Sequence, residues 1–165
     1  MLSKGIQDAI NEQIKHELAS AYLYLSMSAF CEANNLPGTA RWLRMQWEEE
    51  QEHAMKLFDF VNDRGGRVIL QAIDRPLSDF KSLLDIFQQV LAHEQKVTSL
   101  INRLYDAALK ENDYPTQVEL QWFIKEQVEE EKNAAAIVQQ LTMIGEQPSI
   151  LLMIDRELGS RKGKG

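Results

Sequence analysis

The sequence predicts an all-α fold, a four-helix bundle with one long crossover between its second and third helices and a short fifth helix at its C-terminal end. Three observations predict this fold. Long stretches rich in Ala, Leu, Glu, Gln and Lys, which favour helices, are separated by four prolines. No stretch alternates apolar and polar residues over a useful length, so no sheet is expected. One connection is much longer than the others.

The first two helices are expected to form an antiparallel hairpin, because the turn between them is short. The first helix is expected over about residues 3–34, and residues 34–38 are expected to form the turn. Thr39 is expected to cap the second helix, which ends at Gly65 and Gly66, where helices favour glycine.

The third and fourth helices are expected to form a second antiparallel hairpin. The third helix begins near Ser78 or Ser82 and ends near Asn112. Thr116 is followed by Glu119 three residues later, a spacing typical of a capping box at the start of the fourth helix.

The connection between the two hairpins is long enough to run the length of the bundle. It covers residues 66–77, and extended at about 3.3 Å per residue it spans about 40 Å. A helix of about 27 residues is also about 40 Å long. The third helix is therefore expected to run parallel to the second.

The 165 residues are expected to form one domain. The bundle takes up about residues 3–145, the short last helix about 148–159, and residues 160–165 are expected to be a mobile tail. The last helix contains five consecutive apolar residues, 150–154, which cover every side of a helix. This pattern favours contacts with neighbouring subunits. The alternative is a helix that folds back over the end of its own bundle.

Composition and charge exclude several classes of function. The chain has 18 basic and 25 acidic residues, a net charge of −7, which argues against nucleic-acid binding and suits the attraction of cations. Its single cysteine, Cys31, excludes an intramolecular disulfide. We find no signal peptide and no apolar run approaching 18 residues, so a cytoplasmic protein with no membrane span is expected.

A glutamate lies at the centre of the apolar face of each of the first three helices. On a helical wheel, Ile10, Ala21 and Tyr24 fall within about 40° of Glu17. One inward glutamate is usually a polar helix end or a side chain that reaches the surface. Here each of the four helices carries at least one inward polar side chain, and the set comprises Glu17, Glu50, His53, Glu94, Gln127 and Glu130.

The inward residues repeat between the two halves of the chain. An offset of 77 residues relates three pairs of them: Glu17 and Glu94, Glu50 and Gln127, and His53 and Glu130. Several carboxylates that converge in an apolar interior cost several kcal/mol each in lost hydration, and they repel one another. A pair of divalent metal ions offsets both costs. Oxygen-rich ligands with one imidazole suit iron or manganese, and zinc can also occupy such a site.

On these residues the sequence resembles the bacterial non-haem ferritins, and the resemblance covers nearly the whole chain. It is carried by residues on four helices, followed by a short fifth one: Glu17, Tyr24, Glu50-x-x-His53, Glu94 and Glu126-Gln127-x-Glu129-Glu130. The resemblance implies a ferritin-like four-helix bundle. It also implies an iron-storage protein with ferroxidase activity, which oxidises Fe(II) with O2 or H2O2 and keeps the ferric mineral inside a hollow homo-oligomeric shell of twenty-four subunits.

The resemblance also implies roles for individual residues. Glu17, Glu50 and His53 would hold the first iron of a di-iron site, and Glu50 would bridge to the second. The second iron would be held with Glu94 and Glu130, with Gln127 beside it. A third, weaker iron site toward the inner surface of the shell would use Glu49, Glu126, Glu129 and Glu130. Tyr24 would lie next to the di-iron site and take part in catalysis with its ligands.

Two departures distinguish the chain from bacterioferritins. Those proteins repeat Glu-x-x-His in the second half of the chain, where this sequence has Gln127 and Glu130. They also carry a haem-ligating Met directly after the glutamate of the second helix, where this sequence has Gln51, so no haem is expected. A neutral amide at position 127 removes one anionic ligand, and we expect the second iron to be held more loosely.

Three other functions fit the sequence less well. A rubrerythrin-like peroxidase needs a Cys-x-x-Cys pair, which a chain with one cysteine lacks. A structural bundle or a miniferritin-type DNA-protecting shell does not account for inward ligands on all four helices, because miniferritins place their ligands between subunits. A regulatory metal-binding protein without turnover is the remaining alternative, and the open, mixed ligand set favours turnover over it.

Overall fold

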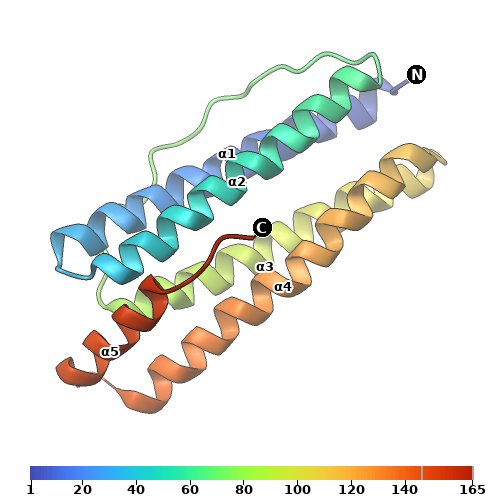
Figure 1. Cartoon of the computed structure of the whole chain (residues 1–165). Coiled ribbons are helices and arrows are strands. Elements are labelled where there is room, and N and C mark those ends of the chain that lie inside the picture. Colours follow the sequence, from blue (N-terminus) through green and yellow to red (C-terminus); the bar gives the residue numbers. More distant parts are fainter. Residues whose placement is uncertain (146, 165) are drawn as a thin grey trace.

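Within residues 1–145 and 147–164, which the computed structural model describes, the chain forms five α-helices (Figure 1): α1 (Lys4–Ala33), α2 (Pro37–Asp63), α3 (Leu83–Lys110), α4 (Tyr114–Ile144) and α5 (Pro148–Gly159). α1 and α2 form one antiparallel hairpin, and α3 and α4 form the other. The predicted all-α fold with a short fifth helix is therefore confirmed.

The crossover between the hairpins runs along the outside of the bundle from one end to the other, so α3 is parallel to α2 as predicted (Figure 1). It is longer than expected, because α3 begins only at Leu83, after the Ser82 cap, and residues 64–82 are non-helical. Gly65 has φ +70, the left-handed conformation that favours glycine at a helix end. The buried Asn11 of α1 holds the crossover by donating to the carbonyl oxygen of Arg67 at 3.1 Å.

Two predicted helix caps are wrong. Thr39 and Thr116 lie inside the first turns of α2 and α4 and do not precede them. Pro37 and the proline in the first turn of α4 explain the difference, because proline has no N–H to lose there and its fixed φ suits the start of a helix. Asp113 caps α4 in place of Thr116 by accepting from the Thr116 N–H at 3.2 Å.

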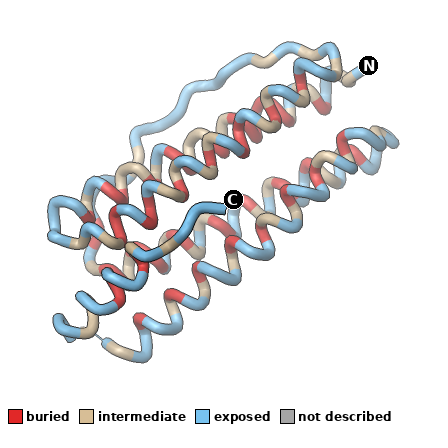
Figure 2. The backbone as a smooth tube through the Cα atoms, viewed as in Figure 1, coloured by how far each residue is buried: buried red, intermediate tan, exposed pale blue. Residues whose placement is uncertain are grey.

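Two clusters of buried apolar side chains fill the bundle on either side of its middle. One includes Tyr24, Leu43 and Phe87 and lies toward α5, and the other includes Leu57 and Ile101. Figure 2 shows buried positions along the inner sides of the helices. Between the two clusters, the buried residues of the four long helices are polar apart from Ala21. The middle of the bundle is therefore a polar belt between two apolar regions.

α5 supplies the cap that α2 lacks. The Asp155 carboxylate accepts hydrogen bonds from the Gly38 N–H at 3.1 Å, the Thr39 N–H at 2.7 Å and the Thr39 hydroxyl at 2.8 Å. A carboxylate at this helix end satisfies free N–H groups and complements the helix dipole. Gly38 permits the approach, because an added Cβ would lie 1.8 Å from the carbonyl oxygen of Asp155.

We expect Asp155→Ala to lower the melting temperature by about 5 °C, since an unsatisfied helix start costs about 2 kcal/mol and a domain of this size loses about 2–4 °C per kcal/mol. Differential scanning calorimetry measures the shift. The matched control is Glu157→Ala, an exposed acidic residue of the same helix. Equal melting temperatures for Asp155→Ala and Glu157→Ala would contradict the capping role.

The five apolar residues of α5 are divided between two environments. Ile154 is buried, with Leu158 beside it, whereas the side chains of Leu152 and Met153 are exposed. One face of α5 therefore folds onto its own bundle, which was the alternative expectation, and another face stays uncovered within the described chain.

The C-terminal tail, which the sequence predicts to be mobile, lies against the bundle in this structure, and its mobility stays a prediction. Residues 160–164 run back from α5 toward the middle of the bundle (Figure 1), and Arg161 and Lys164 contact acidic residues of α2 and α4. Gly165, the last residue of the expected tail, lies outside the described residues. In the part of the chain that the structure describes, no helix combines the length and apolar character needed to cross a membrane.

Candidate metal centre

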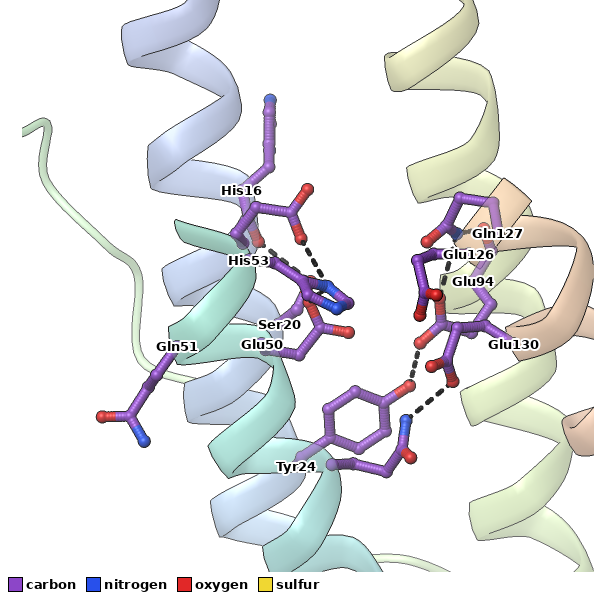
Figure 3. A network of polar contacts seen from close by, with 12 residues as sticks. His16, Ser20, Tyr24, Glu50, Gln51, His53, Glu94, Glu126, Gln127 and Glu130 are labelled. Carbon is purple, nitrogen blue, oxygen red and sulfur yellow. Dashed lines mark hydrogen bonds and ion pairs between the residues drawn. The ribbon is translucent and has the colours of Figure 1, made fainter. Parts of the chain in front are cut away.

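The polar belt contains a compact group of potential metal ligands, Glu17 from α1 and Glu50 and His53 from α2. One donor atom from each lies within 4.8 Å of the other two. His53 Nδ1 lies 3.4 Å from Glu50 Oε2 and 4.0 Å from Glu17 Oε2. All three side chains are buried. Residues three apart share a helix face, so the Glu50-x-x-His53 spacing places both side chains on the inward side of α2 (Figure 3).

A second group faces the first from the other hairpin. It consists of Glu94 on α3 and Gln127 and Glu130 on α4, and all three are buried (Figure 3). The side-chain amide of Gln127 donates to Glu94 Oε2 and to the Glu94 carbonyl oxygen, each at 3.1 Å. The six predicted inner ligands therefore lie in one belt, divided between the hairpins into two groups of three.

Tyr24 links the two groups. Its ring comes from the first hairpin, and its hydroxyl donates to Glu94 Oε1 on the second (Figure 3). The ring also packs edge-on against His93, with the centroids 6.1 Å apart, and His93 Nε2 lies 2.6 Å from Ser20 Oγ. Burial, and then the nearby Glu94 carboxylate, raise the pKa of Tyr24 well above its usual value, so the phenol stays protonated.

Burial and nearby carboxylates favour the protonated forms of three inner carboxyls, Glu17, Glu50 and Glu94. Loss of hydration raises the pKa of Glu17 and of Glu50 well above the usual range. The Glu50 carboxylate raises the pKa of Glu17 further, and the Glu94 carboxylate raises the pKa of Glu50 further. Burial, and then Glu130, raise the pKa of Glu94 to about 7. A cation between these groups would favour their ionised forms and release their protons.

Two buried carboxylate oxygens, Glu49 Oε2 and Glu50 Oε2, have no hydrogen-bond partner among the described residues, and the second of them lies in the inner group. Buried polar atoms are nearly always satisfied, by protein, by water or by an ion. The donor set here is carboxylate oxygen with one imidazole nitrogen, which suits iron or manganese. The residues present therefore fit a divalent cation coordinated by Glu50.

Two supporting residues were not predicted from the sequence. Gln13 Nε2 donates to Glu17 Oε1 at 2.8 Å, and Gln46 Nε2 donates to Glu130 Oε2 at 3.0 Å. Both glutamines are buried, and such hydrogen bonds orient a carboxylate for metal binding. A sequence signal was available, because each glutamine lies four residues before an inward glutamate, one helical turn away on the same face.

The predicted outer ligands gather at the edge of the belt. We call Glu49, Glu126, Glu129 and Glu130 the outer acidic cluster. Arg161 Nη2 lies 2.8 Å from Glu49, and Lys164 Nζ lies 2.8 Å from Glu126. A cavity of about 380 Å³ is lined by residues of this cluster and by His53 of the inner group.

Comparisons with known proteins agree with this architecture. Residues 7–144 match the family Ferritin, described as a ferritin-like domain. The sequence is 40% identical to the bacterial non-heme ferritin of Staphylococcus saprophyticus over 98% of this chain and 96% of that protein. It is 37% identical to the bacterial non-heme ferritin of Staphylococcus aureus over 98% and 97% of the two chains.

Two solved structures of Archaeoglobus fulgidus ferritin are also similar, each 46% identical in sequence. A form engineered to be closed by site-directed mutagenesis superposes with a TM-score of 0.97 over 99% of this chain and 100% of that one. A structure described as a novel open-pore ferritin superposes with a TM-score of 0.96 over 98% of both chains.

Proposed function

Because the chain belongs to the ferritin family, we propose that it stores iron and that its polar belt is a ferroxidase centre. The observation that carries the proposal is the buried group of Glu17, Glu50 and His53, in which Glu50 Oε2 has no partner within the described chain. Fe(II) is the substrate. Two Fe(II) ions supply the two electrons that reduce O2 to H2O2, or H2O2 to two waters.

Each of the two groups of the belt binds one of the two Fe(II) ions. Glu17, Glu50 and His53 bind the first Fe(II), and Glu94 and Glu130 bind the second with Gln127 beside it. Glu50 would bridge the two ions, because its carboxylate lies near enough to Glu94 of the other hairpin for that charge to raise its pKa. The carboxylates neutralise the charge of both ions, and the apolar clusters on either side keep bulk water from the belt.

Tyr24 acts in the same reaction. Its protonated hydroxyl donates to Glu94 and holds that carboxylate in place between the hairpins. A phenol at this position can also supply a proton or an electron to the oxidant. The outer acidic cluster, Glu49 with Glu126, Glu129 and Glu130, provides a third and weaker iron site through which oxidised iron leaves for the store.

Storage requires a shell, and we propose a homo-oligomer of twenty-four subunits. The exposed apolar side chains Leu152 and Met153 of α5 support a subunit contact there. The net charge of −7 favours iron cations over nucleic acid as partners. A cytoplasmic location stays a prediction.

Size-exclusion chromatography after aerobic addition of Fe(II), well beyond two ions per chain, tests the storage function. We expect iron and protein to elute together as a large shell. Iron that stops at two or three ions per chain on a small oligomer would contradict storage and leave only the oxidation of Fe(II).

Replacing Gln127 by Glu tests the role of the neutral amide. The variant adds an anionic ligand to the second site, and we expect about tenfold tighter binding of the second divalent ion, the size of effect that changes beside a metal site produce. The new carboxylate also loses the hydrogen bond to Glu94 and repels it, so the metal-free variant is expected to be less stable than the parent. Calorimetric titration with Zn²⁺ measures the affinity, and unchanged affinity and stoichiometry would contradict the role.

A further inference from the structure

The C-terminal tail is anchored where it leaves α5. The Arg41 guanidinium donates to the carbonyl oxygens of Gly159 at 2.8 Å and of Arg161 at 2.7 Å. The Arg161 guanidinium carbon in turn lies 4.8 Å from the centre of the Trp42 ring, a cation–π distance. These contacts to α2 direct residues 160–164 back along the bundle toward its middle (Figure 1).

Both cations of this segment that turn toward the bundle reach the outer acidic cluster. Arg161 Nη2 donates to Glu49 Oε1 at 2.8 Å. Lys164 Nζ donates to Glu126 Oε2 at 2.8 Å and to Glu130 Oε1 at 3.3 Å, and it lies 3.9 Å from Glu129 Oε1. Together the two cations contact all four members of the cluster. Lys162, by contrast, is exposed and forms no salt bridge among the described residues.

The tail also contacts one oxygen of Glu130, a proposed ligand of the second iron, and reaches the other only through Gln46 of α2. Lys164 contacts Oε1 directly, and Oε2 accepts from Gln46, whose own Oε1 accepts from Arg161. Glu130 is buried, whereas Lys164 is about one-third exposed, so the ammonium group reaches in from solvent to the carboxylate. A metal ion at this edge must compete with Lys164 for Glu130 Oε1 and Glu126 Oε2.

We propose that the tail is an intramolecular counter-cation, in which Arg161 and Lys164 occupy the outer acidic cluster and compete with metal ions for it. The proposal rests on the proposed function only in taking this cluster as a metal site. The docked tail compensates the charge of the cluster in the metal-free protein. A divalent ion that binds there displaces Lys164 first, because Lys164 is the more exposed of the two cations and its chain end is not anchored by Arg41.

The strength of these contacts suits a displaceable tail. Partly exposed ion pairs are worth little individually, while a divalent ion bound by several carboxylates gains much more. The cavity of about 380 Å³ beside the cluster is lined by Lys164 and Gly163 as well as by Glu49 and Glu126. Movement of the tail would therefore enlarge the space in which an ion reaches these carboxylates.

Calorimetric titration of the metal-free full chain with Zn²⁺ tests the proposal without any redox step. We compare the parent with the double variant Arg161→Gln, Lys164→Gln and with the matched control Lys162→Gln. The double variant removes two competing cations and their four ion pairs, which predicts about tenfold tighter Zn²⁺ binding at the outer cluster. The control is expected to match the parent. A Glu126→Gln, Glu129→Gln variant identifies the outer-cluster binding step by losing it.

A nitroxide at Lys162→Cys gives a second readout, since the native Cys31 is buried and stays unlabelled. We expect its electron paramagnetic resonance spectrum to sharpen as Zn²⁺ is added, because the tail is released. Equal Zn²⁺ affinity in the parent and the double variant, or weaker affinity in the double variant, would overturn the proposal, as would a label unaffected by Zn²⁺. Failure of iron storage alone would overturn the proposed function and leave this result standing.

Discussion

The variant Glu50→Ala is expected to slow the oxidation of Fe(II) by at least about 100-fold. Changes in groups that only orient metal ligands cost about 10–100-fold in affinity or activity, so loss of a ligand costs at least the upper end of that range. Glu50 is the ligand that both proposed ions share, and its buried Oε2 has no hydrogen-bond partner in the described chain. Stopped-flow absorbance of Fe(III) formation at two Fe(II) per chain measures the initial rate.

Two further variants separate loss of activity from loss of folding. Burial and nearby carboxylates raise the pKa of Glu50, so its side chain does not stabilise the metal-free bundle as an anion. Glu50→Gln keeps the side-chain volume and is expected to fold with a melting temperature at least equal to that of the parent. Glu52→Ala, an exposed glutamate on the same helix, is the matched control and should oxidise Fe(II) at the parental rate. A fast Glu50→Ala variant would contradict the assigned role.

The second large effect is on stability as a function of pH. Burial and Glu130 raise the pKa of Glu94 from 4.5 in its usual state to about 7 in the folded chain. The folded state therefore binds more protons than the unfolded state between these values, and stability falls as pH rises through this range. Glu94 alone accounts for about 3 kcal/mol of this fall. Glu17 and Glu50 act in the same direction, since burial raises their pKa values too.

Divalent metal is expected to reverse this dependence. Metal ligands must be deprotonated, so binding strengthens as pH rises and returns the stability lost by the metal-free protein. Scanning calorimetry of metal-free protein should show a melting temperature about 10 °C lower at pH 7.5 than at pH 5, and Zn²⁺ should remove the difference. Glu94→Gln is expected to reduce the decrease. A metal-free melting temperature that rises over this pH range would contradict the raised pKa values.

Helix periodicity and connector length predicted the inward positions of the glutamates and the direction of α3. Helix periodicity alone put Glu17, Glu50 and Glu94 on inward faces, and all three are buried in the belt. The length of the connector predicted that α2 and α3 run parallel. Helix periodicity determines which residues share a face, and connector length limits the relative direction of two helices. Both follow from chain geometry.

Contacts between residues far apart in the sequence could not be predicted from these patterns. Asp155 caps α2 across 116 residues of sequence, and Lys164 meets Glu126 across 38. Neither pair has a periodic signature, since each depends on where two elements meet in space. The capping box at Thr116 failed for a different reason, because a proline in the first turn moved the start of α4 to an earlier residue.

Anomalous diffraction from crystals loaded anaerobically with Fe(II), recorded on both sides of the iron absorption edge, would locate the bound iron. We expect two iron positions inside the polar belt, one bound by Glu17, Glu50 and His53 and the other by Glu50, Glu94 and Glu130. Iron found only on surface carboxylates, with the belt free of anomalous density, would contradict this expectation.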